Sequence, residues 1–186
     1  MIKETLKEIS DNFHKLSETS IEEIDSSAEM IIQALLNGNK VMFCGNGGSA
    51  ADAQHLAAEL IGRYRKNRNP IAGIALTTDS SSITAVGNDF SFDEIFSRQV
   101  EALGKEGDIL YAISTSGNSE NIIKSINLAK KLNIKTIGIT GQDGGKIGPI
   151  CDVIIKTPAS RPDRIQEMHI AVGQIICEII ENRLFD

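Results

Sequence analysis

The sequence is poor in residues that several classes of protein need. Its 186 residues include no Trp, two Tyr and six Phe, too few for the stacking platforms of single-stranded nucleic-acid binders. The three cysteines, Cys44, Cys151 and Cys177, form no CxxC pair and no disulfide-framework spacing. No apolar run approaches the roughly 18 residues of a membrane span, and the start, MIKETLKEIS, has no signal-peptide h-region. We therefore expect a cytoplasmic protein with no membrane partner.

A surplus of basic charge is also missing. The chain carries 19 basic and 25 acidic side chains, a net charge of −6, which argues against a nucleic-acid partner. Hydrophobic residues make up 41% of the chain, enough for a core, and the length suits one domain over residues 1–186. What the chain has in excess is glycine, because its 16 glycines cluster in a few segments. These clusters are the first candidates for a binding site.

Residues 1–38 are predicted to form an N-terminal helical extension of two helices. Apolar residues recur at alternating spacings of four and three along the first helix, in a narrow seam formed by Ile2, Leu6, Ile9, Phe13 and Leu16. The segment Ser20-Ile21-Glu22-Glu23 has the pattern of a capping box that starts the second helix, and Asn37-Gly38 has the pattern of its end. Such a seam packs on another helix, which predicts contact with a partner subunit.

Residues 40–186 alternate short apolar runs with helical periods. Apolar strands separated by helices indicate a five-stranded parallel sheet covered on both faces, a doubly wound α/β core of the flavodoxin-like type. The predicted strands are 41–44, 71–76, 109–113, 135–139 and 153–155, and the predicted helices lie near 49–64, 91–103, 119–132 and 162–184. Ligands of such sheets bind at the carboxyl ends of the strands. Three polar, glycine-rich loops, 45–49, 114–119 and 140–145, are predicted at that edge.

The first of these loops fits a dinucleotide-binding pattern. Residues 45–50, GNGGSA, satisfy G-x-G-x-x-A between a strand and a helix. A nicotinamide cofactor would also require an acidic residue at the end of the second strand. That strand ends in Leu76-Thr77-Thr78, with Asp79 only afterwards. A tight turn without a ligand is the alternative, and we expect no nucleotide cofactor.

The second loop, STSGNS at 114–119, is rich in hydroxyl groups. Ser114, Thr115, Ser116 and Ser119 precede a predicted helix, whose first amides and dipole favour an anion. The chain has no GK[ST] sequence, which disfavours nucleoside triphosphate chemistry and suits a phosphomonoester that is bound rather than transferred. A Ser/Thr-rich turn with a simple N-cap is the alternative.

Two helices carry candidate reactive groups. His55 and Glu59 are four residues apart, so they share one helix face and suit a metal site or an acid–base pair. A solvated ion pair is equally compatible with this spacing. On the last helix, Asp163, Gln166 and Gln174 share one broad face, whereas His169 lies about 140° from Gln174. We therefore predict that His169 either packs in the interior or supports the site residues without touching metal or substrate itself, and we assign no role to His14.

Four motifs together resemble the SIS domain, and more narrowly its phosphoheptose isomerase branch. They are GNGGSAADAQHLAAEL at 45–60, Gly87-Asn88-Asp89, STSGNS at 114–119 and RIQEMH at 164–169. The resemblance implies an SIS-type fold and an aldose–ketose isomerase that converts sedoheptulose 7-phosphate to D-glycero-D-manno-heptose 7-phosphate through an enediol(ate). It also implies a homotetramer with shared active sites.

The same resemblance implies the roles of individual residues. Glu59 and Gln174 would be catalytic, and a Zn²⁺ ion would be held by His55, Glu59, Gln166 and Gln174. The implied substrate contacts are Asn46, Gly47, Gly48, Ser49, Arg63, Asn88, Asp89, Ser114, Thr115, Ser116, Ser119, Asp163 and Gln166. This sequence departs from the family pattern at Gln174, where the family has a histidine. An amide can accept or donate a hydrogen bond, but it cannot exchange a proton near pH 7.

Two rival functions are compatible with parts of the sequence. A non-catalytic SIS protein that serves as a scaffold for the bacterial replication initiator would fit Gln174, but that branch lacks the acidic residue that this chain keeps as Glu59. A dinucleotide-dependent oxidoreductase would fit residues 45–50 alone. Turnover of sedoheptulose 7-phosphate separates the first rival from the isomerase, and binding of NAD(P) tests the second.

Overall fold

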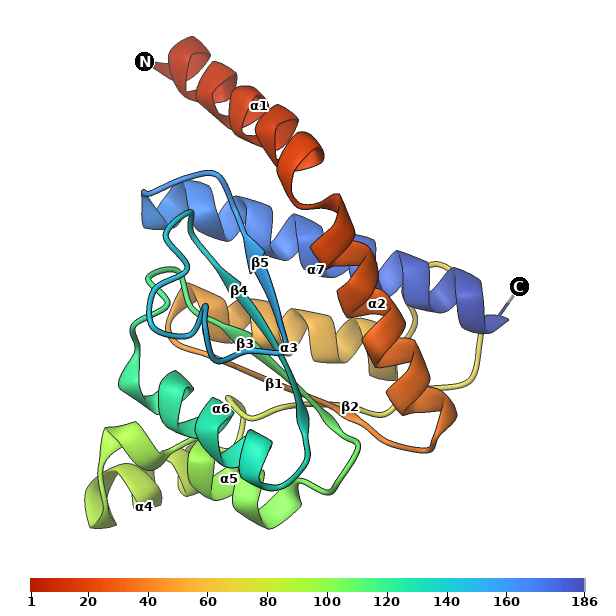
Figure 1. Ribbon diagram of the computed structural model, residues 1–186, viewed down its shortest axis with the longest axis vertical. Helices are drawn as coiled ribbons and strands as arrows, with labels where there is room; N and C mark the ends of the chain where they lie inside the picture. Colours follow the sequence, from red (N-terminus) through yellow and green to blue (C-terminus); the bar gives the residue numbers. More distant parts are fainter. Residues whose placement is uncertain (186) are drawn as a thin grey trace.

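A computed structural model describes residues 1–185 of the chain (Figure 1). Its helices and strands follow one another in the order α1(Ile2–Thr19), α2(Ile21–Leu36), β1(Val41–Gly45), α3(Gly48–Ile61), β2(Gly73–Ala75), α4(Ser80–Asp89), η1(Phe92–Glu94), α5(Ser97–Leu103), β3(Ile109–Ile113), α6(Glu120–Lys131), β4(Lys135–Thr140), β5(Val153–Lys156) and α7(Pro162–Phe185). No helix within residues 1–185 is long and apolar enough to cross a membrane.

The five strands form one parallel sheet in the order β2-β1-β3-β4-β5. This is the predicted flavodoxin-like order, and its topological switch point lies between β1 and β3. Every residue of β1 and β3 is buried, which explains their uninterrupted apolar sequences. The loops that follow these two central strands therefore open side by side at the carboxyl edge of the sheet.

Helices cover both faces of the sheet, as predicted for a doubly wound fold (Figure 1). One core lies between the sheet and α2, α3 and α7, where Phe43 and Tyr111 meet Leu56 and Ile176. The other core lies between the sheet and α5 and α6, with side chains of α4 at its margin. Of the two N-terminal helices, α2 belongs to the first layer, whereas α1 projects from the body and buries only Leu16.

The structure corrects two predictions made from local sequence and adds one helix. Ser20 does precede α2, but its hydroxyl donates to the Lys156 carbonyl at 2.9 Å instead of capping the helix, so the capping box is wrong. The predicted helix 91–103 is a 3₁₀ turn, η1, followed by the shorter α5. Helix α4, over residues 80–89, was not predicted, because none of its residues is buried and its sequence has no strong apolar period.

A buried ion pair holds the end of α3 against α7. The Glu181 carboxylate accepts hydrogen bonds from the backbone amides of Tyr64, Arg65 and Lys66 at 2.7–3.1 Å, and from Arg68 Nε at 2.8 Å. Arg68 also donates to the backbone carbonyl of Glu59 at 2.8 Å. Because both side chains are only 2% exposed, this cluster fixes the register between the two helices that carry the candidate reactive groups.

Candidate functional site

The loop after β1 is held by an amide pair that sequence analysis missed. Asn46 and Asn121, in the first turn of α6, exchange two side-chain hydrogen bonds of 2.9 Å each. Ser49 is buried at the start of α3, and Gly47 has a positive φ of 57° that glycine adopts without strain. The only sequence signal for Asn121 was its place two residues after the hydroxyl-rich loop. The pair ties the glycine loop of β1 to the hydroxyl loop of β3.

The hydroxyl loop is ordered by its own backbone. The Ser114 hydroxyl accepts from the Gly117 amide at 3.1 Å and lies 3.4 Å from the Ser119 hydroxyl. The Ser116 hydroxyl accepts from the Asn118 amide at 3.1 Å and is exposed to solvent. Gly117 has a φ of 64°, and a Cβ there would clash with the carbonyl oxygen of Gly144. Hydroxyls and free amides thus converge at the start of α6, as an anion site requires.

The predicted pair on α3 is formed. His55 Nε2 lies 2.9 Å from Glu59 Oε1, and the two side chains are 47% and 20% exposed. One turn earlier, Asp52 is the nearest further carboxyl in the helix. Burial raises its pKa to about 6 despite the opposing effect of His55, and its Oδ2 is buried with no hydrogen-bond partner within residues 1–185. The Glu59 carboxylate is thus partly exposed and is adjoined by an imidazole.

Helix α7 runs alongside α3 and brings the Gln166 amide to it. A Cβ built on Gly48 would lie 2.7 Å from Gln166 Nε2 and Oε1, which places that amide against the first turn of α3. A Cβ on Gly173 would lie 2.6 Å from the Leu56 side chain, so the part of α7 that carries Gln174 packs closely on the middle of α3. Gln166 and Gln174 are about 12 Å apart along the helix axis. His169 is only 1% exposed and burial lowers its pKa to about 4, which confirms that it packs in the interior.

The donor set suits a divalent ion only in part. Residues 1–185 contain no group of three or more His, Cys, Asp and Glu side chains that could hold a metal. His55 and Glu59 supply two conventional ligands at adjoining positions, and the amide oxygens of Gln166 and Gln174 are weaker donors on the facing helix.

Two of the predicted substrate contacts, Asn88 and Asp89, lie apart from the His55–Glu59 pair. Asn88 and Asp89 hydrogen-bond to each other at 2.8 Å at the end of α4, on the opposite face of the sheet from α3 (Figure 1). Arg63 is exposed beyond the end of α3. Asp163 is exposed and paired with Arg161 at 2.7 Å. The single chain therefore does not gather the whole predicted set around Glu59.

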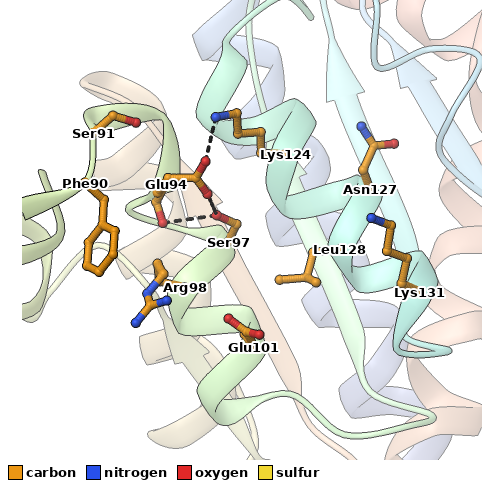
Figure 2. Close-up of a pocket in the computed structure, with 10 residues that line it drawn as sticks. All are labelled: Phe90, Ser91, Glu94, Ser97, Arg98, Glu101, Lys124, Asn127, Leu128 and Lys131. Carbon is orange, nitrogen blue, oxygen red and sulfur yellow. Dashed lines mark hydrogen bonds and ion pairs between the residues drawn. The ribbon is translucent and has the colours of Figure 1, made fainter.

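A separate hollow of about 590 Å³ lies between α5 and α6 (Figure 2). An ion pair of 2.6 Å between Glu94 and Lys124 spans it, and the Arg98 guanidinium stacks over Phe90. None of the predicted site residues lines it. Its surface is a mixed-charge helix junction, and the candidate site remains at the loops of β1 and β3.

Comparison with known proteins agrees with the fold and the loops. The SIS domain family model matches residues 6–141, which contain both loops and the His55–Glu59 pair. The phosphoheptose isomerase of Aliarcobacter butzleri is 53% identical over 170 residues, which cover 91% of this chain and 90% of that protein. The enzyme of the same name from Rhodospirillum rubrum is 55% identical over 161 residues, covering 87% and 86% of the two chains.

Solved structures give the same result. A phosphoheptose isomerase from Neisseria gonorrhoeae superposes with a TM-score of 0.93 at 42% identity, covering 97% of both chains. One from Francisella tularensis has a TM-score of 0.94 at 36% identity, covering 97% of this chain and 96% of the other. The fold and loops thus define an SIS-domain sugar-phosphate isomerase. Within that class the chain belongs to the phosphoheptose isomerase family. The comparisons do not support the rival function as a replication scaffold.

Proposed function

We propose that this enzyme converts sedoheptulose 7-phosphate to D-glycero-D-manno-heptose 7-phosphate in the cytoplasm. The observation that carries the proposal is the pairing of an accessible Glu59 carboxylate with a hydroxyl-rich anion loop at one sheet edge. Relatives that share about half of their aligned residues with this chain are named phosphoheptose isomerase, and that name supports the same substrate. The free cysteines suit a reducing compartment.

In this proposal Glu59 is the catalytic base. It removes a proton from C1 of the ketose, which leaves a 1,2-enediol(ate), and it returns the proton to C2 to give the aldose. Another proton moves between the oxygens on C1 and C2. Gln174 can hydrogen-bond to a sugar hydroxyl but cannot exchange a proton, so proton transfer at carbon rests on Glu59. His55, at 2.9 Å, orients the carboxylate.

The loops of the two central strands would anchor the substrate. Ser114, Thr115, Ser116 and Ser119 would cradle the phosphate with the first amides of α6. Asn46, Gly47, Gly48, Ser49 and Gln166 would line the sugar side, where Gln166 already lies against Gly48. Fixing the phosphate in this way holds the reacting carbons at a constant position relative to the base.

The proposed metal is Zn²⁺, held by His55, Glu59, Gln166 and Gln174. When bound, it would polarise the substrate carbonyl and stabilise negative charge on the enediolate. The adjoining imidazole and carboxylate fit such an ion, and the two amides complete a weak set. Tight metal binding is therefore not expected of this chain.

We also propose a homotetramer in which neighbouring subunits complete each site. Asn88 and Asp89 lie away from Glu59 in one chain, so a second chain would have to supply them. An apolar groove of about 530 Å³ between the α1–α2 corner and α7 offers a contact surface. Its exposed apolar residues include Ile21 and Ile175, and Ile2 and Leu6 extend the apolar surface along α1.

The decisive experiment is a turnover assay of the purified full chain on sedoheptulose 7-phosphate, with the product followed by NMR. Formation of the aldose supports the proposal, and its absence in the presence of added Zn²⁺ overturns it.

Mixed subunits test the shared site. Glu59→Gln and Asp89→Asn chains, unfolded and reassembled together, should recover activity that neither has alone. Activity no higher than that of either parent would exclude sharing of Asp89.

A further inference from the structure

The hydroxyl loop interlocks with the loop that follows β4. The Gly141 amide donates to the Thr115 carbonyl, and the Ile147 amide donates to the Gly117 carbonyl, each at 3.0 Å. The Lys146 amide donates to Asn118 Oδ1 at 3.2 Å. Residues 141–148, which include most of the third glycine-rich loop, therefore form a second wall beside the candidate phosphate site.

This second wall carries two lysines. Lys146 is exposed directly beside Asn118. Lys156 ends β5, and its side chain extends over Gly144. A Cβ on Gly144 would lie 2.8 Å from Lys156 Cε and 3.4 Å from Nζ. Within residues 1–185, neither ammonium group has a hydrogen-bond or ion-pair partner.

Two acids border the same loops. Glu120 begins α6, and Asp143 precedes Gly144, both exposed. Without the lysines this rim would carry a charge of −2, on a chain whose net charge is already −6 when they are counted. Neutral hydroxyls and amides alone would then have to hold a phosphate dianion against repulsion, which is unfavourable in a partly exposed site.

We propose that Lys146 and Lys156 form a cationic rim that makes the hydroxyl loop specific for phosphate dianions. The rim deepens the proposed function, because it concerns the phosphate end of that substrate. Its lysines offset Glu120 and Asp143, draw the dianion to the loop and favour its retention. They take no part in the proton transfer at Glu59. The rim thus determines which sugars are bound and leaves the chemical step unchanged.

The test uses the full chain with Lys146→Gln, Lys156→Gln and the double substitution. Lys131→Gln, an exposed lysine at the far end of α6, is the matched control. The double variant should raise KM for sedoheptulose 7-phosphate about tenfold, which corresponds to about 1.4 kcal/mol, while kcat changes less than about twofold. It should also flatten the dependence of kcat/KM on ionic strength. The control should match the wild type.

Calorimetry with inorganic phosphate separates this inference from the proposed function. If the wild type does not turn over the sugar, the isomerase proposal fails, and weaker phosphate binding by the double variant still supports the rim. If the double variant keeps the wild-type KM, salt dependence and phosphate affinity, the rim is excluded even though the enzyme is active. Should the double variant fail to fold, the two single variants decide by the same criteria, each with a smaller expected effect.

Discussion

Two glutamates lie near the C-terminal end of the α3–α7 pair, and they are surrounded differently. Glu181 is almost completely buried, and its carboxylate accepts hydrogen bonds from three backbone amides and one guanidinium N–H. Glu59 is 20% exposed, and its side chain contacts His55 at 2.9 Å. A carboxylate that stabilises a fold has its acceptors occupied by the protein. A carboxylate proposed to take a proton from a substrate must keep acceptor capacity free and accessible.

The two clusters are also connected. Arg68, which pairs with Glu181, donates to the backbone carbonyl of Glu59 at 2.8 Å. The buried Glu181–Arg68 cluster therefore fixes the backbone from which Glu59 projects its side chain. The comparison leads to distinct expectations: damage at Glu59 should affect turnover, and damage at Glu181 should affect stability.

The largest effect is expected for Glu59→Gln. The amide has the same shape as the carboxylate but cannot accept the proton, so kcat should fall about 10³-fold. Substrate affinity should stay within about tenfold, and the free energy of unfolding should hardly change, because Glu59 is partly exposed. Steady-state kinetics and urea unfolding of the same preparation measure both. Near-normal turnover would contradict the assignment of Glu59 as base.

Glu181→Ala should destabilise the fold by about 3–5 kcal/mol, because it leaves Arg68 buried without its partner and frees three backbone amides. Urea unfolding measures the loss. Glu178→Ala is the control, since this neighbour on α7 forms an exposed pair with Arg65 at 2.5 Å and should cost less than about 1 kcal/mol. Equal losses of unfolding free energy in the two variants would show that the buried cluster stabilises the fold no more than the exposed pair does.

Acid should weaken the Glu181 cluster selectively. Burial alone would raise the pKa of Glu181, but the backbone amides and Arg68 outweigh it and lower the pKa from 4.5 to about 2. The cluster therefore stabilises the fold fully above about pH 4.5, and this contribution is lost as the pH falls towards 2. The stability difference between wild type and Glu181→Gln should shrink over that range. Buried His169 contributes the same pH dependence to both proteins, so its contribution cancels in this stability difference. A difference independent of pH would refute the lowered pKa.

The smallest effect is expected for Gln174→His. Imidazole is a stronger metal ligand than an amide and can exchange protons, so metal affinity or kcat should rise by a few-fold. Zinc titration and steady-state kinetics report the two quantities separately. If a folded Gln174→His variant gains neither, Gln174 is adapted to this enzyme.

Local patterns predicted most of the architecture. Apolar runs separated by helical periods predicted all five strands and the doubly wound class. A strand that is buried on both faces of a parallel sheet needs apolar residues at nearly every position, so it is visible in the sequence. The spacing of four between His55 and Glu59 predicted their contact, because it depends on one helix alone. The capping box failed because the Ser20 hydroxyl reaches a carbonyl 136 residues away, which no local pattern encodes.

The sequence by itself determined the periodicity of the elements, the hydroxyl-rich loop and the glutamate beside a histidine. Only the tertiary structure decided which distant residues meet: Gln166 against Gly48, Asn46 with Asn121, and Glu181 on the segment after α3. It also decided that Asp89 lies on the opposite face of the sheet from Glu59. The physical reason is that secondary structure follows from contacts a few residues apart, whereas these pairs depend on how helices pack across a shared core.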